Sequence, residues 1–325
     1  MKNRHGDGAI ENKVFHQKVL KNQVHETMTN NLKYLLGPMR IPFLVITPAS
    51  VLLGLGTAVW TAGHVSIYYF ILALLGAVSA HISVNAFNEY FDFKSGLDLK
   101  TSRTPFSGGS GTLPERPAMA CCVLYTAVIT FAVTVFMGLF FIYVRGLWLL
   151  PVGVLGLLTI FAYTPWLSGS PLLCLVAPGV GFGPLMVMGT HFVLTGEYSL
   201  PAFIASLVPF FLISDLLLLN QFPDIEADRN VGRRNFPIVV GRRNSGFIYG
   251  VFLLMAYLSI IFGACFGFLP EITLIGLLTV IMAVPAFVGG IRYRENIEKL
   301  IPYMGLNVII CVVTPVLVAA GLLVA

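Results

Sequence analysis

Nine long apolar runs constrain the fold of this chain more than any other feature of its sequence. They cover about 41–63, 67–92, 118–143, 147–164, 172–195, 200–222, 246–269, 272–290 and 303–324. A helix needs roughly 20 apolar residues to cross the hydrocarbon core of a bilayer. Only 11% of the 325 residues are charged, against about 25% in soluble domains. The sequence therefore predicts an all-α polytopic membrane protein, with about nine transmembrane helices around a central cavity.

The first 39 residues are polar and basic, unlike the rest of the chain. We expect residues 1–39 to form an N-terminal extension and residues 40–325 to form the transmembrane domain. Apolar residues between Val14 and Val24 recur loosely at helical spacing among lysines, which fits a helix lying on an anionic membrane surface. A disordered tail fits the same residues.

Positive charge indicates how the chain is oriented. Of the twenty Lys and Arg residues, seven lie in 1–40, four in 92–117, five in 223–245 and three in 291–302, which leaves only Arg145. With nine spans these four segments share one side, and the positive-inside rule assigns that side to the cytoplasm. We expect a protein of the cell inner membrane with a cytoplasmic N-terminus. Its partner is the lipid bilayer, and neither a nucleic acid nor an obligate protein partner is implied.

The second apolar run ends in a cluster of amides and acids. Asn85, Asn88 and Asp92 lie three, four or seven residues apart, so they share one face of a helix. Gly96 is a typical helix stop, which would place Asp98 on the loop beyond. Oxygen ligands at a membrane surface suit a hard cation such as Mg2+, and Mg2+ suits a phosphate. A solvated helix end explains these residues equally well when they are considered alone.

A second cluster repeats the first. The segment Asn220–Asp224 has the pattern Asn-x-aromatic-x-Asp that is found at Asn88–Asp92. Asn220, Asp224 and Asp228 recur four residues apart, in one helical stripe if the helix survives the intervening proline. Two matched clusters at two membrane-helix ends are difficult to explain as solvated surfaces. We therefore predict one Mg2+–diphosphate site, with the metal ligands Asn88, Asp92, Asp98, Asp224 and Asp228.

Basic side chains near the clusters could bind the diphosphate. Arg229 and Arg233 lie closest to the second cluster, although some of these arginines could instead anchor lipid headgroups. The loop 99–117 is rich in Gly, Ser, Thr and Pro, and its backbone N–H groups could wrap anionic oxygens, with Arg103 adding charge. A flexible connector explains this loop equally well. The predicted catalytic residues are Asp92, Asp224, Asp228 and Arg229.

Two other polar residues lie inside apolar runs. His81 precedes Asn85 by four residues and could line the same cavity, or could be a packed core histidine. Asp215 lies near the middle of a span, where acids usually face a cavity or a partner. It is about half a turn out of phase with Asp224, so we expect it not to join that cluster, and its role is left open.

These motifs resemble the paired Asp-rich motifs of the UbiA superfamily of intramembrane aromatic prenyltransferases. Within that superfamily, Asn88–Asp98, Asn220–Gly241 and the Arg-Ile-Pro that begins at Arg40 are similar to 1,4-dihydroxy-2-naphthoate polyprenyltransferases of menaquinone synthesis. The resemblance covers roughly residues 38–325. It departs at Pro184, where the naphthoate subgroup often has Glu, and this departure concerns the acceptor rather than the superfamily.

The resemblance implies that an allylic polyprenyl diphosphate ionises with Mg2+ as cofactor and that the ring of an aromatic acceptor then attacks the allyl cation. Aromatic faces stabilise such a cation, and Tyr163 is a candidate for that wall. With the naphthoate as acceptor, its carboxylate is lost and demethylmenaquinone forms. The predicted substrate-binding residues are Asn85, Asn88, Asp98, Arg103, Tyr163, Asn220 and Arg233.

Other functions fit part of the pattern. Relatives in the superfamily prenylate 4-hydroxybenzoate, a haem, a chlorophyllide or an archaeal glycerol lipid. CDP-alcohol phosphotransferases also carry Asp clusters at the membrane edge, but their Asp-Gly…Ala-Arg motif is absent here. A cation-coupled transporter would favour carboxylates at the membrane midplane, whereas here every candidate except Asp215 lies at the edge.

Overall fold

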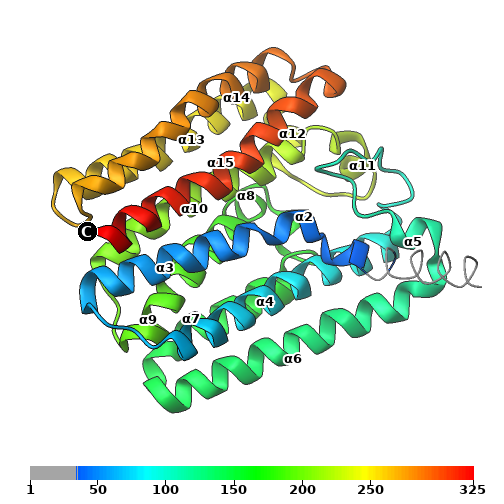
Figure 1. The fold of residues 1–325 in the computed structure, drawn as a ribbon. Coiled ribbons are helices and arrows are strands. Elements are labelled where there is room, and N and C mark those ends of the chain that lie inside the picture. The colour runs from blue at the N-terminus through cyan, green and yellow to red at the C-terminus, as the bar shows by residue number, and fades with distance from the viewer. Residues whose placement is uncertain (1–33, 35) are drawn as a thin grey trace, which may run out of the picture.

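The computed structural model describes Tyr34 and residues 36–325, and this part of the chain folds into helices without any strand (Figure 1). The long helices run side by side as a bundle. The predicted surface helix between Val14 and Val24 lies outside the described residues. The all-α prediction is confirmed.

The longer helices are α3 (Ile46–Ala62), α4 (Ile67–Lys94), α6 (Ala120–Arg145), α7 (Leu150–Ala162), α8 (Pro171–Val180), η5 (Gly181–Met188), α9 (Gly189–Thr195), α10 (Leu200–Asn220), α13 (Gly241–Cys265), η6 (Glu271–Thr279), α14 (Val280–Arg292) and α15 (Ile297–Val324). Shorter helical segments connect them: η1 (Gly37–Met39), α2 (Ile41–Leu44), α5 (Thr112–Glu115), η2 (Pro117–Met119), η3 (Leu147–Leu149), η4 (Leu167–Gly169), α11 (Ile225–Asn230) and α12 (Phe236–Val239).

Seven helical segments of the described chain are long and apolar enough to cross a membrane, which makes this a multi-span membrane protein. They are Ile67–Lys94, Pro117–Arg145, Pro171–Thr195, Leu200–Asn220, Gly241–Cys265, Glu271–Arg292 and Ile297–Val324. The pair Gly37–Leu44 and Ile46–Ala62 also passes together but is bent by 45°, and Leu147–Ala162 is apolar but shorter. Each of the nine predicted spans therefore coincides with a helix or helix pair. That all nine cross the membrane stays a prediction.

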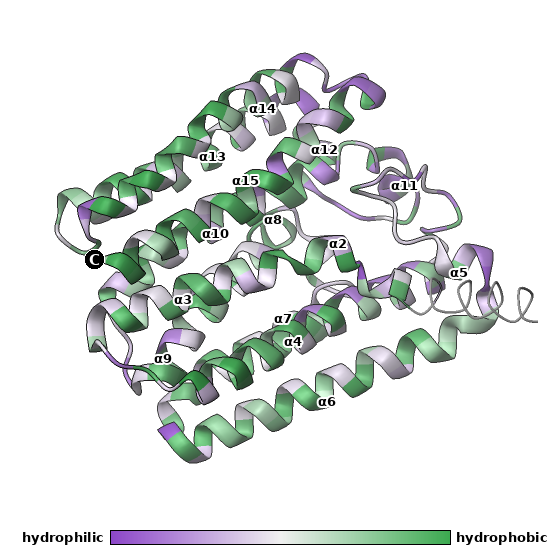
Figure 2. Cartoon of the chain, viewed as in Figure 1, coloured by the Kyte–Doolittle hydropathy of each residue, from purple (hydrophilic) through white to green (hydrophobic). Residues whose placement is uncertain are grey.

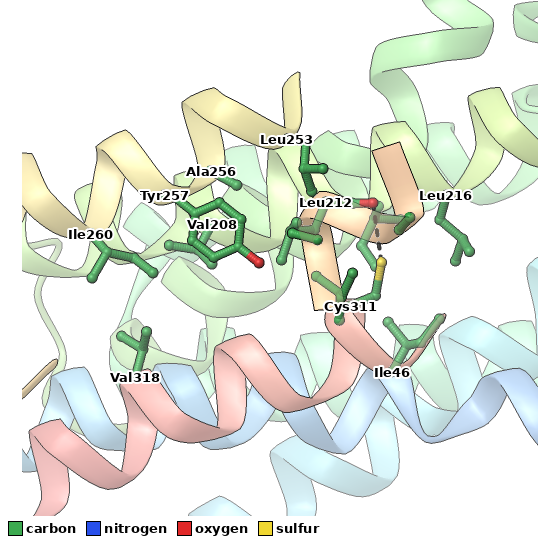
Figure 3. Close-up of a cluster of buried hydrophobic side chains, with 14 of the residues drawn as sticks. Ile46, Val208, Leu212, Leu216, Leu253, Ala256, Tyr257, Ile260, Cys311 and Val318 are labelled. Atoms are coloured by element: carbon green, nitrogen blue, oxygen red, sulfur yellow. Dashed lines mark hydrogen bonds between the residues drawn. The ribbon is translucent and has the colours of Figure 1, made fainter. Parts of the chain in front are cut away.

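Helix α10 forms the centre of the bundle. Of its most apolar stretch, 72% is buried, against 11% for the span that contains α6. It packs against α8, η5, α13 and α15, and Figure 3 shows Leu212 of α10 between Leu253 and Cys311. The Cys311 thiol donates to the Leu212 carbonyl at 3.2 Å. Because α10 is surrounded by other helices, it is apolar on every side.

The helices that carry the two acidic clusters finish at the same end of the bundle. Helix α4 ends at Lys94, and Gly96 turns the chain with a φ of 77°, as the predicted helix stop requires. Helix α10 ends at Asn220 and α11 begins only at Ile225, so the predicted stripe of three residues is interrupted after its first member. Hydrophilic residues gather at this end, around α5 and α11 (Figure 2).

Candidate functional site

The ends of α4 and α10 enclose a polar cavity of about 110 Å³, the polar chamber. Its charged lining residues are Arg40, Asp92, Asp98, Asp224, Asp228 and Arg233. Residues 97–109 close one side and residues 220–235 close the other. The two acidic clusters that were recognised separately in the sequence thus face each other across one cavity.

Arg233 joins the two clusters. Its guanidinium forms an ion pair with Asp92 of α4 and a second one, at 3.2 Å, with Asp228 of α11. Asn235 completes this group by donating to the other Asp228 oxygen at 2.7 Å. Burial works against the charged guanidinium, but the carboxylates of Asp92 and Asp228 outweigh it and raise the Arg233 pKa. The turn at Gly232, with a φ of 80°, brings Arg233 back over α11.

Each cluster also contains a carboxyl that no positive side chain pairs. One oxygen of Asp98 and one of Asp224 are buried without a hydrogen-bond partner among the described residues, as is the amide oxygen of Asn220. Burial, followed by the nearby carboxylates Glu89 and Asp92, raises the pKa of Asp98 to about 8. Burial and then Asp228 raise the pKa of Asp224 to about 7. The chamber is thus lined by four aspartates and two arginines, and burial favours the neutral forms of Asp98 and Asp224 as long as no cation binds beside them.

These unpartnered oxygens fit a hard divalent cation. Mg2+ takes carboxylate and amide oxygens as ligands, and a buried acceptor without a partner is destabilising by about 1–3 kcal/mol. A cation between Asp98 and Asp224 would supply that partner and lower the pKa of both carboxyls. No group of three or more His, Cys, Asp or Glu side chains is already arranged to hold a metal within the described chain.

Asn85 and Asn88 of α4 form hydrogen bonds with the residues that directly precede the first span. Asn88 accepts from Arg40 at 3.3 Å and donates to Thr164 at 3.1 Å. Asn85 donates to the Met39 carbonyl at 3.1 Å. Arg40 itself has a φ of 51°, in the left-handed region that non-glycine residues rarely adopt. These contacts hold the Arg40 side chain against the polar chamber.

The loop after α4 covers the polar chamber and is held in place by hydrogen bonds to a side chain of α4. Glu89, which is fully buried, accepts from the Ser110 backbone N–H at 3.0 Å and from its hydroxyl at 2.5 Å. Thr104 and Ser107 are joined by a side-chain hydrogen bond of 2.9 Å. Phe106 between them lines the polar chamber and reaches Gly305 of α15.

Two predicted site residues lie away from the chamber. Arg229 pairs with Glu226 at 3.2 Å and is 54% exposed, and Arg103 pairs with Glu115 at 3.1 Å. Neither arginine lines the cavity. The catalytic role of Arg229 and the substrate-binding role of Arg103 stay predictions, which the positions of the two side chains do not support.

A larger apolar cavity of about 410 Å³ continues from the polar one, and we call it the apolar chamber. Helices α4, α6, α7, α8, η5 and α10 contribute its walls. The residues that line both chambers are Arg40, Asn88, Phe106, Tyr163, Leu217 and Asn220. Tyr163 was predicted there. His81 also lines the apolar chamber, with its Nδ1 2.7 Å from the Thr47 hydroxyl.

Asp215 lies apart from both chambers. It is fully buried in α10, and neither carboxyl oxygen has a hydrogen-bond partner among the described residues. Tyr249 of α13 and Cys311 of α15 are its electrostatic neighbours. The structure thus agrees with the expectation that it does not join the second cluster.

Sequence reasoning did not select Arg40, Phe106 or Asn235 as site residues. Arg40 had a usable signal, since it is a lone cation directly before the first apolar run. Asn235 had none, because its contact with Asp228 depends on the turn between them. Phe106 is one of 25 phenylalanines, and only its place in the loop after α4 sets it apart.

The chain is similar to known proteins over most of its length. The model of the UbiA prenyltransferase family matches residues 48–309. The chain is 25% identical over 203 residues to a 1,4-dihydroxy-2-naphthoate octaprenyltransferase of Bacillus subtilis, covering 61% of this chain and 63% of that protein. It is 30% identical over 219 residues to UbiA prenyltransferase domain-containing protein 1 of Danio rerio, covering 66% and 62%. The chain thus spans somewhat less than two thirds of the length of these curated relatives.

A solved structure shares the fold. A UbiA homologue from Archaeoglobus fulgidus, bound to GPP and Mg2+, superposes with a TM-score of 0.63 at 13% identity. The superposition covers 89% of this chain and 99% of that one. At this identity the likeness concerns the arrangement of the helices alone.

Proposed function

This chain belongs to the UbiA prenyltransferase family, and from that premise we propose that it transfers a polyprenyl group from an allylic diphosphate to 1,4-dihydroxy-2-naphthoate. The observation that supports this most strongly is the junction of the two chambers. A diphosphate requires positive charge and metal ligands, and its prenyl chain requires an apolar cavity. The six residues that line both chambers mark the point where the two halves of such a substrate would meet.

The polar chamber would hold the diphosphate with Mg2+. Asp98, Asp224 and Asn220 offer unpartnered oxygens as ligands, while Asp92, Asp228 and Asn88 lie beside them. Bound Mg2+ would neutralise the charge that develops on the leaving diphosphate. Arg40 and Arg233 add fixed positive charge to the lining, which favours breakage of the allylic carbon–oxygen bond.

The junction would hold the allyl group as that bond breaks. Tyr163 and Phe106 present aromatic rings there, and such rings attract a cation held over their faces. An electron-rich ring carbon of the acceptor would then attack the allylic carbon. Loss of the acceptor's carboxylate as carbon dioxide restores aromaticity. The loop that Glu89 anchors would keep water from the cation while this happens.

The acceptor can be tested directly. Purified protein in detergent would receive Mg2+, a labelled polyprenyl diphosphate and either dihydroxynaphthoate or 4-hydroxybenzoate. We expect the naphthoate to be prenylated at a clearly higher kcat/KM. Preferential prenylation of the benzoate would refute the proposed acceptor while leaving prenyl transfer intact.

We further propose that the polar chamber opens to the cytoplasm, because the loops at its end of the bundle carry most of the Lys and Arg residues. Ser102→Cys and Arg234→Cys, two exposed positions in these loops, each in a background without the five native cysteines, would report the side. We expect a membrane-impermeant thiol reagent to label both only after the membrane is opened. Labelling from outside in intact cells would reverse the orientation.

A further inference from the structure

Two glycines leave a gap between the side chains with which α7 lines the apolar chamber. On α7, Gly153 and Gly156 line the chamber together with Ile160 and Tyr163. Their spacing of three, four and three residues puts all four on one helix face. The opposite face carries Leu155 and Leu158, which are 53% and 58% exposed and do not line the chamber. The glycine face of α7 therefore points into the cavity and the leucine face points to lipid.

The space in front of these glycines is open. An added Cβ at Gly153 or Gly156 would meet no atom within 4 Å. Helix α4 also contributes small residues to the lining of the chamber, Ala73, Gly76, Ala77 and Ala80. Small residues on α7 and α4 thus leave a channel within the apolar chamber, and this channel can admit a long flexible ligand. A leucine side chain at either glycine would therefore begin in open space and extend into the chamber.

The polar end of the channel indicates what kind of ligand this is. Asn220, which is only 9% exposed, lines both chambers and has an amide oxygen without a partner among the described residues. Tyr163 lies at the same junction, at the end of the α7 face that carries the glycines. A ligand that fills the channel would therefore carry a polar group at the junction, and that group could bind a metal.

We propose that Gly153 and Gly156 determine which prenyl chain lengths the protein accepts. This inference rests on the proposed function. Gly156 and Gly153 lie seven and ten residues before Tyr163, roughly 10 and 15 Å along the helix axis. One isoprene unit contributes four main-chain carbon–carbon bonds of about 1.5 Å, hence about 5 Å when extended. The second isoprene unit therefore ends near Gly156 and the third near Gly153.

The test is a ladder of variants against a ladder of substrates. Gly156→Leu and Gly153→Leu would be assayed with Mg2+, the naphthoate, and the dimethylallyl, geranyl, farnesyl and geranylgeranyl diphosphates, which contain one to four units. We expect Gly156→Leu to retain the first two and to lose farnesyl and geranylgeranyl transfer by roughly tenfold or more. Gly153→Leu should retain farnesyl as well and lose only geranylgeranyl transfer.

Leu155→Phe is the matched control, because it adds bulk to the lipid-facing side of the same helix and should leave the whole profile unchanged. Equal losses at every chain length, or no change at any length, would overturn the inference. A wild-type protein that transfers none of these chains would instead contradict the proposed function. In that case the same ladder, measured as Mg2+-dependent thermal stabilisation by the four diphosphates, tests the channel by itself.

Discussion

The two acidic clusters pair their aspartates in the same way but differ in how deeply their glutamates are buried. In each cluster Arg233 pairs one carboxylate, Asp92 or Asp228. Each also retains one carboxyl, Asp98 or Asp224, with an oxygen that has no partner within residues 34 and 36–325. The clusters differ in the remaining acid, which is Glu89 in the first and Glu226 in the second. Glu89 is buried beneath the loop after α4, whereas the Glu226 side chain is 77% exposed.

This difference separates the acids that line the polar chamber from the two glutamates that do not. The paired carboxylates line the chamber and connect the end of α4 to α11 through one guanidinium. The unpaired ones face the polar chamber, where a cation would stabilise them. Glu89 holds a loop, and Glu226 lies in water. Substitutions should therefore affect turnover less and less in the order Asp92 and Asp224, Arg233, Glu89 and Glu226.

The largest effect should come from removing one anionic ligand from either cluster. Asp92→Asn and Asp224→Asn keep the shape of the side chain but remove its charge. Each should lower kcat by about 10²- to 10⁴-fold, because metal charge stabilisation contributes several kcal/mol and each 1.36 kcal/mol is tenfold in rate. Steady-state prenyl transfer at saturating Mg2+ measures this. Thermal unfolding should show that both variants are folded.

Arg233→Lys should have the next largest effect. Lysine keeps the charge but lacks the planar fork that contacts Asp92 and Asp228 at once. Losing one charged hydrogen bond of about 1.5–3 kcal/mol predicts a roughly 10- to 100-fold lower kcat/KM. The exposed Arg234→Lys is its neighbour and control. Equal kinetics for the two variants would show that the bridge has no role in turnover.

Glu89→Gln should have a moderate effect that is visible in stability. The amide oxygen can accept only one of the two hydrogen bonds from Ser110, and the Ser110 hydroxyl would have to turn and accept from the new N–H group, so a hydrogen bond to a charged acceptor is lost. We expect the unfolding midpoint to fall by a few degrees and turnover to fall by roughly two- to tenfold. Unchanged stability and turnover would mean that the loop after α4 is not held by this contact.

Glu226→Gln should have the smallest effect. Its exposed pair with Arg229 contributes little, because surface ion pairs are worth about 0–1 kcal/mol. We expect kcat and KM within roughly twofold of the wild type. A loss comparable to that of Asp224→Asn would mean that Glu226 and Arg229 turn into the chamber during catalysis, which would restore the catalytic role predicted for Arg229.

The sequence was sufficient to predict the helices and the two clusters, because both depend on local pattern. Long apolar runs predict spans, and Gly96 predicts the end of α4. It was not sufficient to predict which charged residues enter the chamber. Arg229 and Arg233 are equally plausible from their spacing, and only the turn at Gly232 separates them. The position of Arg40 requires a left-handed backbone, its contact with Asn88 and the hydrogen bond from Asn85 to the preceding carbonyl, which no local pattern specifies.

The central claim is that Asp92 and Asp224 act on one Mg2+–diphosphate group from two helices. The measurement that tests it most directly is a double-mutant cycle of kcat for Asp92→Asn, Asp224→Asn and the combined variant. If both carboxylates serve the same ionisation, the double variant should lose far less than the product of the two single losses. Losses that multiply fully, or single variants that turn over near the wild-type rate, would contradict the account.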